Sequence, residues 1–352
     1  MKLRTVKIGN KTVGGESPCY TIAEAGANHD GTVEKAFRLI DAAVVAKADS
    51  IKFQTYTARR LVTKTAPKYW EDGIPNETQF DVFEKLDSLT NDNWKSIFDY
   101  ADTKKITCFS TPFDEESADL LYSLNVPAFK IASADITHIP LIKHVAGKKL
   151  PILISTGMAS ELDIQEAIDA IEDKGNHDII IMHCITSYPT KPEDANLEMI
   201  RTLVNKFSDY IIGYSDHTIG TVVPICSTFY GAKCIVKHFT FDTSLTQSRD
   251  HRLSLDTEGF SNMVDGLRLV EISRGINIRT SFDVEKEAVK YARRSIVSTT
   301  KISKGTLIKK EMLDIKRPGT GIPPKFLDKV IGKKALKDIE EDIPLTYEDI
   351  SI

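Results

Sequence analysis

Eight short apolar runs alternate with longer segments of helical periodicity in the first three quarters of this 352-residue chain. Near-continuous apolar character is typical of parallel strands that helices bury on both faces. Eight such units predict a (β/α)8 TIM barrel over residues 1–276. An open doubly wound sheet is the alternative, disfavoured because no Gly-x-Gly-x-x-Gly motif follows a strand. The runs occupy residues 19–26, 49–56, 106–113, 128–133, 151–157, 178–185, 210–217 and 233–241.

The two ends of the chain differ from this central pattern. Ahead of the first strand, LRTVKIGNKTVGG predicts a β-hairpin that turns at Gly9-Asn10 and closes the bottom of the barrel. After residue 276 the alternation stops, and the polar residues 277–287 are typical of a linker. Residues 288–352, which glycine and proline interrupt densely, predict a small separate domain of short strands and turns.

Charge and composition exclude several classes of protein. A formal net charge of −4 and a pI of about 6.1 argue against binding to nucleic acid or to an anionic membrane. No apolar run approaches the roughly 20 residues of a membrane helix, and the start of the chain lacks the apolar region of a signal peptide. Five scattered cysteines form no Cys-x-x-Cys pair. We therefore expect a cytoplasmic protein.

Polar residues cluster at the C-terminal ends of the predicted strands, where barrels of this type carry their chemistry. Among them, Lys52 and Lys130 stand in apolar strands, and buried lysines are rare unless they are paired. Two inward cations ringed by hydroxyls and backbone N–H groups predict a site for a phosphate-bearing anion. The alternative is that each lysine pairs with a barrel carboxylate such as Glu24.

Two histidines, His217 and His238, end neighbouring predicted strands. Their imidazoles could converge on one divalent metal ion, with Glu24 and waters completing an open shell suited to polarising a carbonyl group. His183 is assigned a structural role, with metal ligation as the alternative. Loop or surface positions are expected for His29, His138, His144, His177 and His251.

Sequence motifs span these strands in order, and two more lie near the C-terminus. They are IAEAGANHDGTVEKAFRLIDAA, IKFQTY, CFSTPFD, FKIAS, ISTGMAS, HCITSYPT, YSDHT and KHFTFD, followed by ISKGTLI and KRPGTGI. This set resembles the sialic acid synthases, which make N-acetylneuraminate and its bacterial relatives legionaminate and pseudaminate and which end in an antifreeze-like SAF domain. The resemblance implies a transferase that condenses phosphoenolpyruvate with an N-acylated hexosamine aldehyde and releases phosphate by C–O cleavage.

The same resemblance implies roles for individual residues. His217 and His238 would bind the metal, usually Mn²⁺ with Mg²⁺ or Co²⁺ as substitutes, and Glu24 would be the acid/base or water-orienting group. Arg317 would be inserted over the sugar by the SAF domain of a neighbouring subunit, which implies a domain-swapped homodimer. The phosphoenolpyruvate contacts would be Lys52, Thr111, Lys130, Ser133, Ser155 and Ser215. The sugar contacts would be Gln54, Thr186, Tyr188 and Asp250.

Two positions depart from the neuraminate-specific pattern, which often has Asn in place of Thr186 and Glu in place of Val236. Both lie near the sugar in the family, so N-acetylneuraminate and legionaminate both stay open as products. The segment QSRDHRLSLD keeps an Asp-His pair that disfavours pseudaminate. Alternative functions are another keto-deoxy sugar acid synthase, which would lack the SAF module, and a non-catalytic scaffold for polysaccharide biosynthesis.

Overall fold

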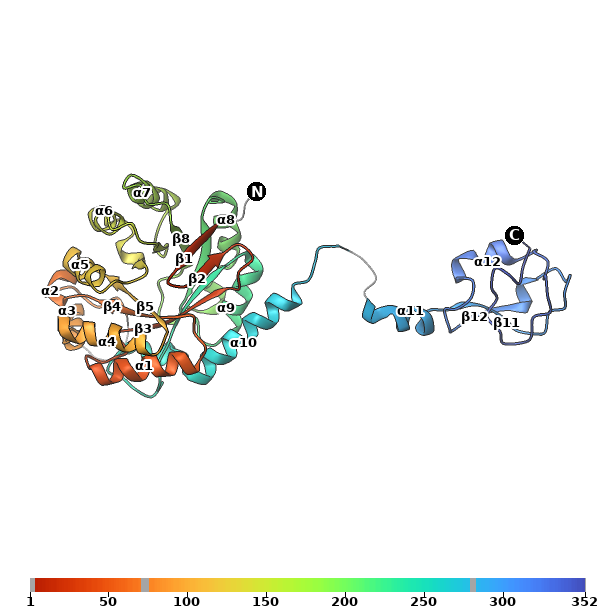
Figure 1. The fold of residues 1–352 in the computed structure, drawn as a ribbon, viewed down its shortest axis with the longest axis horizontal. Coiled ribbons are helices and arrows are strands. Elements are labelled where there is room, and N and C mark those ends of the chain that lie inside the picture. The colour runs from red at the N-terminus through yellow and green to blue at the C-terminus, as the bar shows by residue number, and fades with distance from the viewer. Residues whose placement is uncertain (1–3, 71–75, 279–282, 352) are drawn as a thin grey trace. The chain divides into compact units, whose positions relative to one another are not determined.

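Eight parallel strands close into a barrel in the first part of the chain (Figure 1). The computed structural model describes residues 4–70, 76–278 and 283–351. Each strand lies inside the run predicted for it, and the last pairs with the first, so the prediction of a TIM barrel is confirmed. The strands are β3 (Tyr20–Gly26), β4 (Ser50–Thr55), β5 (Thr107–Pro112), β6 (Phe129–Ile131), β7 (Ile152–Ser155), β8 (Ile179–Cys184), β9 (Ile211–Asp216) and β10 (Cys234–His238).

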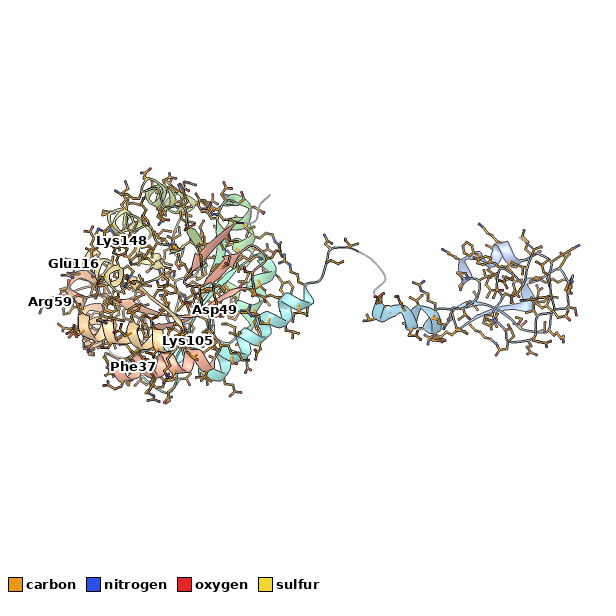
Figure 2. All side chains as sticks on the ribbon, viewed as in Figure 1. Phe37, Asp49, Arg59, Lys105, Glu116 and Lys148 are labelled. Carbon is orange, nitrogen blue, oxygen red and sulfur yellow. The ribbon has the colours of Figure 1, made fainter. Side chains whose placement is uncertain are left out.

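Helices follow the strands and surround the barrel (Figure 1). Several begin at a side chain that caps the helix, as at Ser160, which forms a capping box with Asp163. Phe37, labelled in Figure 2, stacks on Tyr100 with ring centroids 4.1 Å apart and joins the first helix to its neighbour. These helices are α1 (Val33–Val45), α4 (Asn91–Thr103), α5 (Glu115–Ser123), α6 (Ile139–Ala146), α7 (Glu161–Glu172), α8 (Glu198–Lys206), α9 (Val222–Ser227) and α10 (Thr257–Ser273).

Two short helices between β4 and α4, α2 (Ala58–Leu61) and α3 (Gln79–Leu86), are not anticipated by the sequence analysis. α2 is a single turn, too short to show a periodic pattern. α3 begins at a capping box in which Thr78 and Asp81 exchange hydrogen bonds. Because they follow β4, both helices stand at the end of the barrel where the polar residues gather.

The N-terminal hairpin consists of β1 (Thr5–Ile8) and β2 (Lys11–Gly14). It lies against the opposite end of the barrel, where the strands begin: Gly9 approaches Thr107 at the start of β5, and Gly14 approaches Ile211 at the start of β9. Asp49, labelled in Figure 2, ties the hairpin to the barrel through an ion pair of 2.5 Å with Lys11. The polar end and the hairpin end are therefore opposite faces of the barrel.

Contacts divide the chain into two compact units, Met1–Gly275 and Ile276–Ile352, beside the predicted boundary at residue 276. In the second unit, β11 (Ser295–Ser298) pairs antiparallel with β12 (Leu313–Lys316). Isolated bridges such as Ile302–Ile339 add to this pair. A separate apolar core is formed by Ile296, Ile302, Ile308, Ile322, Val330, Ala335, Ile339, Leu345 and Ile350.

The predicted linker over residues 277–287 and the predicted start of the second domain at residue 288 need a correction. A helix, α11 (Lys286–Ala292), crosses that boundary because the sequence KEAVKYA consists mostly of good helix formers. A second short helix, α12 (Leu327–Val330), lies within the domain predicted to hold only strands and turns. Residues 279–282 of the linker lie outside the described residues. Throughout the described ranges, no helix is long and apolar enough to cross a membrane.

Candidate active site

Alternate residues of the barrel strands point inward, and at the carboxyl ends of the strands these residues are polar. On β4, Lys52 and Gln54 line the barrel interior while Phe53 packs in the hydrophobic core outside it. The inward residues surround a deep cavity of about 60 Å³. It is lined by Glu24, Lys52, Gln54, Thr111, Lys130, Ala132, Ser133, Ser155, Cys184, Tyr188, Ser215, His217, Val236 and His238.

The two predicted lysines both line this cavity, but their partners differ. Lys52 is 2% exposed, forms an ion pair with Glu24 and donates a hydrogen bond of 2.7 Å to the Thr111 hydroxyl. For Lys52, the structure therefore bears out the alternative of a barrel carboxylate partner. Lys130 is 5% exposed and has no hydrogen bond or ion pair within the part of the chain that is described. Burial, together with the charge of Lys52, lowers the pKa of Lys130 to about 8.

A third buried lysine, on the outward face of the barrel strands, has an ion-pair partner of the kind that Lys130 lacks among the described residues. Lys237 precedes His238 on β10, faces the surrounding helices and is fully buried. It forms an ion pair of 2.6 Å with Asp216, so its charge is satisfied inside the protein. The charge of Lys130 has no such partner, and an anionic ligand in the deep cavity would supply one.

Hydroxyl groups complete the wall of the deep cavity. Ser155 at the end of β7 is buried, and its Oγ has no hydrogen-bond partner. The Ser133 hydroxyl accepts a hydrogen bond of 3.0 Å from the backbone N–H of Gly157. A Cβ at Gly157 would collide with the Oγ atoms of Ser133 and Thr186, so only glycine lets these loops approach so closely.

The two predicted metal ligands lie side by side, with ring centroids of His217 and His238 5.4 Å apart. Nδ1 of His217 donates a hydrogen bond of 2.7 Å to the Ile185 carbonyl, which leaves Nε2 as the free ligand atom. Burial lowers the pKa of His238 to about 3, so its ring is neutral, as metal ligation requires. For His217, burial lowers the pKa, but its interactions with Cys184, Ile185 and Asp216 together outweigh that effect, so the pKa is raised.

These donors fit a divalent cation that takes most of its ligands from water or substrate. Within the described ranges, no three His, Cys, Asp or Glu side chains come together as a complete metal cluster. Glu24, expected to complete the shell, forms an ion pair with Lys52 through Oε2, and its Oε1 has no hydrogen-bond partner among the described residues. The histidine pair supplies two neutral imidazole ligands, and Asp250 lies 3.6 Å from Nδ1 of His238. Such a site leaves positions open for a carbonyl oxygen.

A wider outer cavity of about 490 Å³ adjoins the deep one. The two share Gln54, Ala132, Ser133, Tyr188 and His238 as lining residues. Apolar side chains of α2, α3 and the β5–α5 loop form much of its wall: Leu61, Val82, Phe83, Leu86 and Phe113. Polar groups stand opposite, among them the predicted sugar contacts Gln54, Thr186, Tyr188 and Asp250.

Every barrel residue that the sequence analysis assigns to the site lines one of these two cavities. Buried polar atoms are normally hydrogen-bonded, so unpartnered ones mark places where a ligand is expected. Most of the unpartnered buried side-chain atoms in the described residues face the two cavities. They are Oε1 of Glu24, Oη of Tyr56, Oδ2 of Asp135, Oγ of Ser155, Oγ1 of Thr186, Nδ1 of His238, Nη1 of Arg249 and Oδ1 of Asp250.

Sequence reasoning missed two charged residues of the outer cavity, Asp135 and Arg249. Asp135 follows β6 in a single 3-10 turn, and burial raises the pKa of its carboxyl to about 6. Arg249 lies in the loop after β10, next to Asp250. No strand or helix period marks either position, although Asp135 follows directly on the FKIAS motif.

His29 and His251 lie in loops, as predicted, but both are buried, and His251 contacts Asp30 at 3.2 Å. This contact holds the loop after β10 against the loop after β3. His183 is buried, and its Nε2 lies 2.9 Å from the Ala195 carbonyl, which agrees with a structural role.

Arg317 lies in the second unit, directly after β12. Its side chain is exposed and forms no hydrogen bond or ion pair within the described ranges. The loop that follows is anchored: Ser295 donates a hydrogen bond of 2.7 Å to the Pro318 carbonyl, and the Gly319 N–H donates one of 2.8 Å to the Lys290 carbonyl. The arginine is thus carried on a fixed turn with its guanidinium free.

A third hollow of about 520 Å³ lies at the hairpin end of the barrel, beside Gly9 and Thr107. It is open, and none of the unpartnered buried atoms belongs to its lining residues. The chemistry of the site therefore belongs to the carboxyl end.

Comparisons with known proteins agree with this geometry. Residues 39–279 match the NeuB family, and residues 293–351 match the SAF domain. The N,N'-diacetyllegionaminic acid synthase of Legionella pneumophila is 37% identical over 97% of this chain and 97% of its own. The pseudaminic acid synthase of Campylobacter jejuni is 36% identical over 95% of this chain and 97% of its own.

A solved structure extends the likeness to three dimensions. The crystal structure of N-acetylneuraminic acid synthetase from Leptospira borgpetersenii is 31% identical, covers 82% of this chain and 95% of its own, and superimposes with a TM-score of 0.72. Barrel, site and C-terminal domain therefore lead to one assignment. The chain belongs to the NeuB family and carries a C-terminal SAF domain.

Proposed function

We propose that this protein is a transferase that condenses phosphoenolpyruvate with the aldehyde form of an N-acylated hexosamine. The product would be a nine-carbon sialic-type acid, N-acetylneuraminate or legionaminate, formed with release of phosphate. The observation that carries the proposal is the convergence of unpartnered polar atoms on two adjoining cavities, with the unpaired cation of Lys130 at the deeper one. The names of the relatives in the NeuB family support the reaction class.

Phosphoenolpyruvate would occupy the deep cavity. Lys130, which has no ion pair or hydrogen bond with the residues that the structure describes, would pair with its phosphate or carboxylate. Lys52 would share its charge between the ligand and Glu24. The hydroxyls of Thr111, Ser133, Ser155 and Ser215 are short donors that suit the remaining anionic oxygens.

The proposed reaction forms one C–C bond and breaks the C–O bond to phosphate. C3 of the enolpyruvate attacks the aldehyde carbon, whose oxygen takes up a proton and becomes a hydroxyl. The oxygen of a water molecule adds at C2, the C2–O bond to phosphate breaks, and the new C2 hydroxyl loses its proton to become the keto group. The unpartnered Oε1 of Glu24 is suited to orienting the water and accepting a proton from it.

A divalent cation such as Mn²⁺, Mg²⁺ or Co²⁺, held by His217 and His238, would supply Lewis-acid polarisation of the aldehyde carbonyl. The sugar would extend from there into the outer cavity, where Gln54, Thr186, Tyr188 and Asp250 would hold its polar groups. Five free cysteines support a cytoplasmic location for this reaction.

We further propose that Arg317 acts in the barrel of a second subunit, in a domain-swapped homodimer. Its guanidinium is exposed, has no partner in the described ranges and is carried on an anchored turn, which supports this role. A planar guanidinium suits the carbonyl and hydroxyl oxygens of an acylated sugar.

Pseudaminate synthesis is a second candidate, because the relatives named for legionaminic and pseudaminic acids are almost equally similar to this chain. The SAF match disfavours a keto-deoxy sugar acid synthase without that module. The preserved set of unpartnered polar groups disfavours a non-catalytic scaffold.

The test is an assay of phosphate release from phosphoenolpyruvate with Mn²⁺ and a panel of sugars. The panel contains N-acetylmannosamine and the diacetamido-trideoxyhexoses that lead to legionaminate and pseudaminate. Sugar-dependent phosphate release by the wild type, lost in Lys130→Met, would support the proposal. Phosphate release without any dependence on sugar, or none with any member of the panel, would contradict it.

A further inference from the structure

Asp216 and Lys237 form a buried ion pair directly beside the two predicted metal ligands. Asp216 is the last residue of β9 and precedes His217, while Lys237 precedes His238, the last residue of β10. The two charged residues lie opposite each other on these parallel strands, and Nζ and Oδ2 are 2.6 Å apart. Both side chains are fully buried on the outward face of the barrel, whereas the histidines face the deep cavity.

The carboxylate of Asp216 fixes the turn that carries His217. Its Oδ1 accepts hydrogen bonds of 2.9 Å from the backbone N–H of Thr218 and from the Tyr214 hydroxyl. Its Oδ2 accepts one of 3.0 Å from the Thr218 hydroxyl. Because the carboxylate binds the residue two positions further along the chain, His217 is held in the middle of a closed turn.

Lys237 links this turn to the neighbouring strand. Its ammonium group donates hydrogen bonds to Oδ2 of Asp216 and to the backbone carbonyl of Thr218, the residues on either side of His217. His238 follows Lys237 directly, and the ring centroids of the two histidines are 5.4 Å apart. One buried cation therefore joins the two backbone segments that carry the predicted ligands.

Stability does not account for a charged pair at this place. Near the same end of the barrel, outward positions of β4, β6 and β7 carry Phe53, Ile131 and Ile154, which belong to the apolar core. Removing two charges from water costs about as much as their attraction returns, so an apolar pair of similar volume would pack equally well. The ion pair adds direction, because its hydrogen bonds fix the relative position of two strand ends.

We propose that the Asp216–Lys237 pair is a positioning device that sets the separation of His217 and His238, and thereby their affinity for a divalent cation. Metal–nitrogen bonds are about 2.1 Å long, so a shift of about 0.5 Å in either ring weakens binding. Asp216 and Lys237 touch neither the cation nor the substrates and act only through the histidines. The inference rests on the metal site of the proposed function and adds two residues to it.

The test separates positioning from stability by comparing single and double variants. Asp216→Asn removes the negative charge but keeps an oxygen that accepts hydrogen bonds from Thr218 and Tyr214, and Lys237→Met removes the cation. Each single change leaves one buried charge without its counter-ion, so both single variants should unfold at lower urea concentrations than the wild type. The double variant buries no charge at this place, so its urea midpoint should return to that of the wild type.

Mn²⁺ binding to the metal-free proteins is the measurement that a purely structural role would not change. Calorimetry is done at a temperature where circular dichroism shows every variant folded. The double variant should bind Mn²⁺ roughly 10- to 100-fold more weakly than the wild type. Its affinity for phosphoenolpyruvate, measured without metal, should not change, because Lys130 is untouched. The matched control is Lys47→Met with Asp265→Asn, which removes an exposed ion pair of 3.0 Å and should change neither affinity.

The outcomes distinguish this inference from the proposed function. Weak Mn²⁺ binding by the folded double variant, with phosphoenolpyruvate binding intact, supports the inference. Wild-type Mn²⁺ affinity in the double variant means that the pair serves folding alone, and an equal loss for phosphoenolpyruvate means that the whole end of the barrel is disturbed. Either of these results overturns the inference while the metal site stands. A wild type that binds no Mn²⁺ overturns the metal site together with the inference.

Discussion

Lys130 offers the sharpest test of the deep cavity, because its charge is buried and has no ion-pair partner in the described part of the chain. In the unfolded chain the side chain keeps its proton up to a pKa of 10.5, but in the folded barrel only up to about 8. At neutral pH the charged lysine therefore opposes folding, and this cost disappears as the pH rises from about 8 to 10.5. The gap between the two values corresponds to about 3 kcal/mol.

The change Lys130→Met removes the charge and keeps an unbranched side chain of similar length. Near pH 7 and without ligand, we expect the variant to have a free energy of unfolding equal to that of the wild type or higher, by up to about 3 kcal/mol. We also expect its kcat/KM for phosphoenolpyruvate to fall by roughly 10- to 100-fold, because an ionic hydrogen bond to the ligand is lost. Stability and activity should thus move in opposite directions.

Thermal unfolding with and without phosphoenolpyruvate measures both effects, and calorimetry in buffers of different ionisation enthalpy adds a third. Ligand binding should raise the pKa of Lys130, so the wild type should take up a proton on binding near pH 8 and lose affinity as the pH rises further. The variant should show neither effect. A variant that is clearly less stable than the wild type yet binds phosphoenolpyruvate equally well would refute the reasoning.

Three further predictions concern the metal, the second subunit and the sugar. Chelation should abolish turnover, and Mn²⁺ should restore it. The His217→Ala, His238→Ala double variant should stay inactive at any Mn²⁺ concentration, and full activity of this variant would contradict the assignment of the two histidines as metal ligands. A mixture of the Arg317→Ala and Lys52→Ala chains should regain activity, because hybrid dimers contain one intact site. An inactive mixture despite proven subunit exchange would rule out action between subunits. Truncation near residue 285 should leave a barrel that binds phosphoenolpyruvate but barely turns over. N-acetylmannosamine 6-phosphate should be a poorer substrate than N-acetylmannosamine because Asp135 and Asp250 repel its phosphate, and the reverse order in competition assays would count against this.

The barrel could be predicted because its strands are buried on both faces and therefore stand out as apolar runs. The same property exposes the site: Lys52 and Lys130 are conspicuous since they interrupt such runs. Short helices are harder to predict, because α2 is a single turn and α11 lies in a charged segment where no core-facing stripe marks it.

The partners within the site could be predicted only in part. Lys52 meets Glu24, whereas Lys130 has no ion pair or hydrogen bond among the described residues. This difference depends on which strands are neighbours and how they are staggered, and the linear sequence does not display it. The burial of His251 likewise depends on two distant loops meeting at Asp30. Arg249 was overlooked because a loop has no period against which an unusual residue can be noticed.

The register of the barrel has a consequence for how such an enzyme can change. Glu24 lies opposite Lys52 on one neighbouring strand and opposite His238 on the other, so backbone pairing aligns these three side chains in one row. The polar residues of the outer cavity, such as Thr186 and Arg249, lie instead on loops that can vary without shifting this row. Exchanging the segment between β4 and α4 together with the loop after β10 should therefore retarget the enzyme to a different aldose while leaving its handling of phosphoenolpyruvate intact.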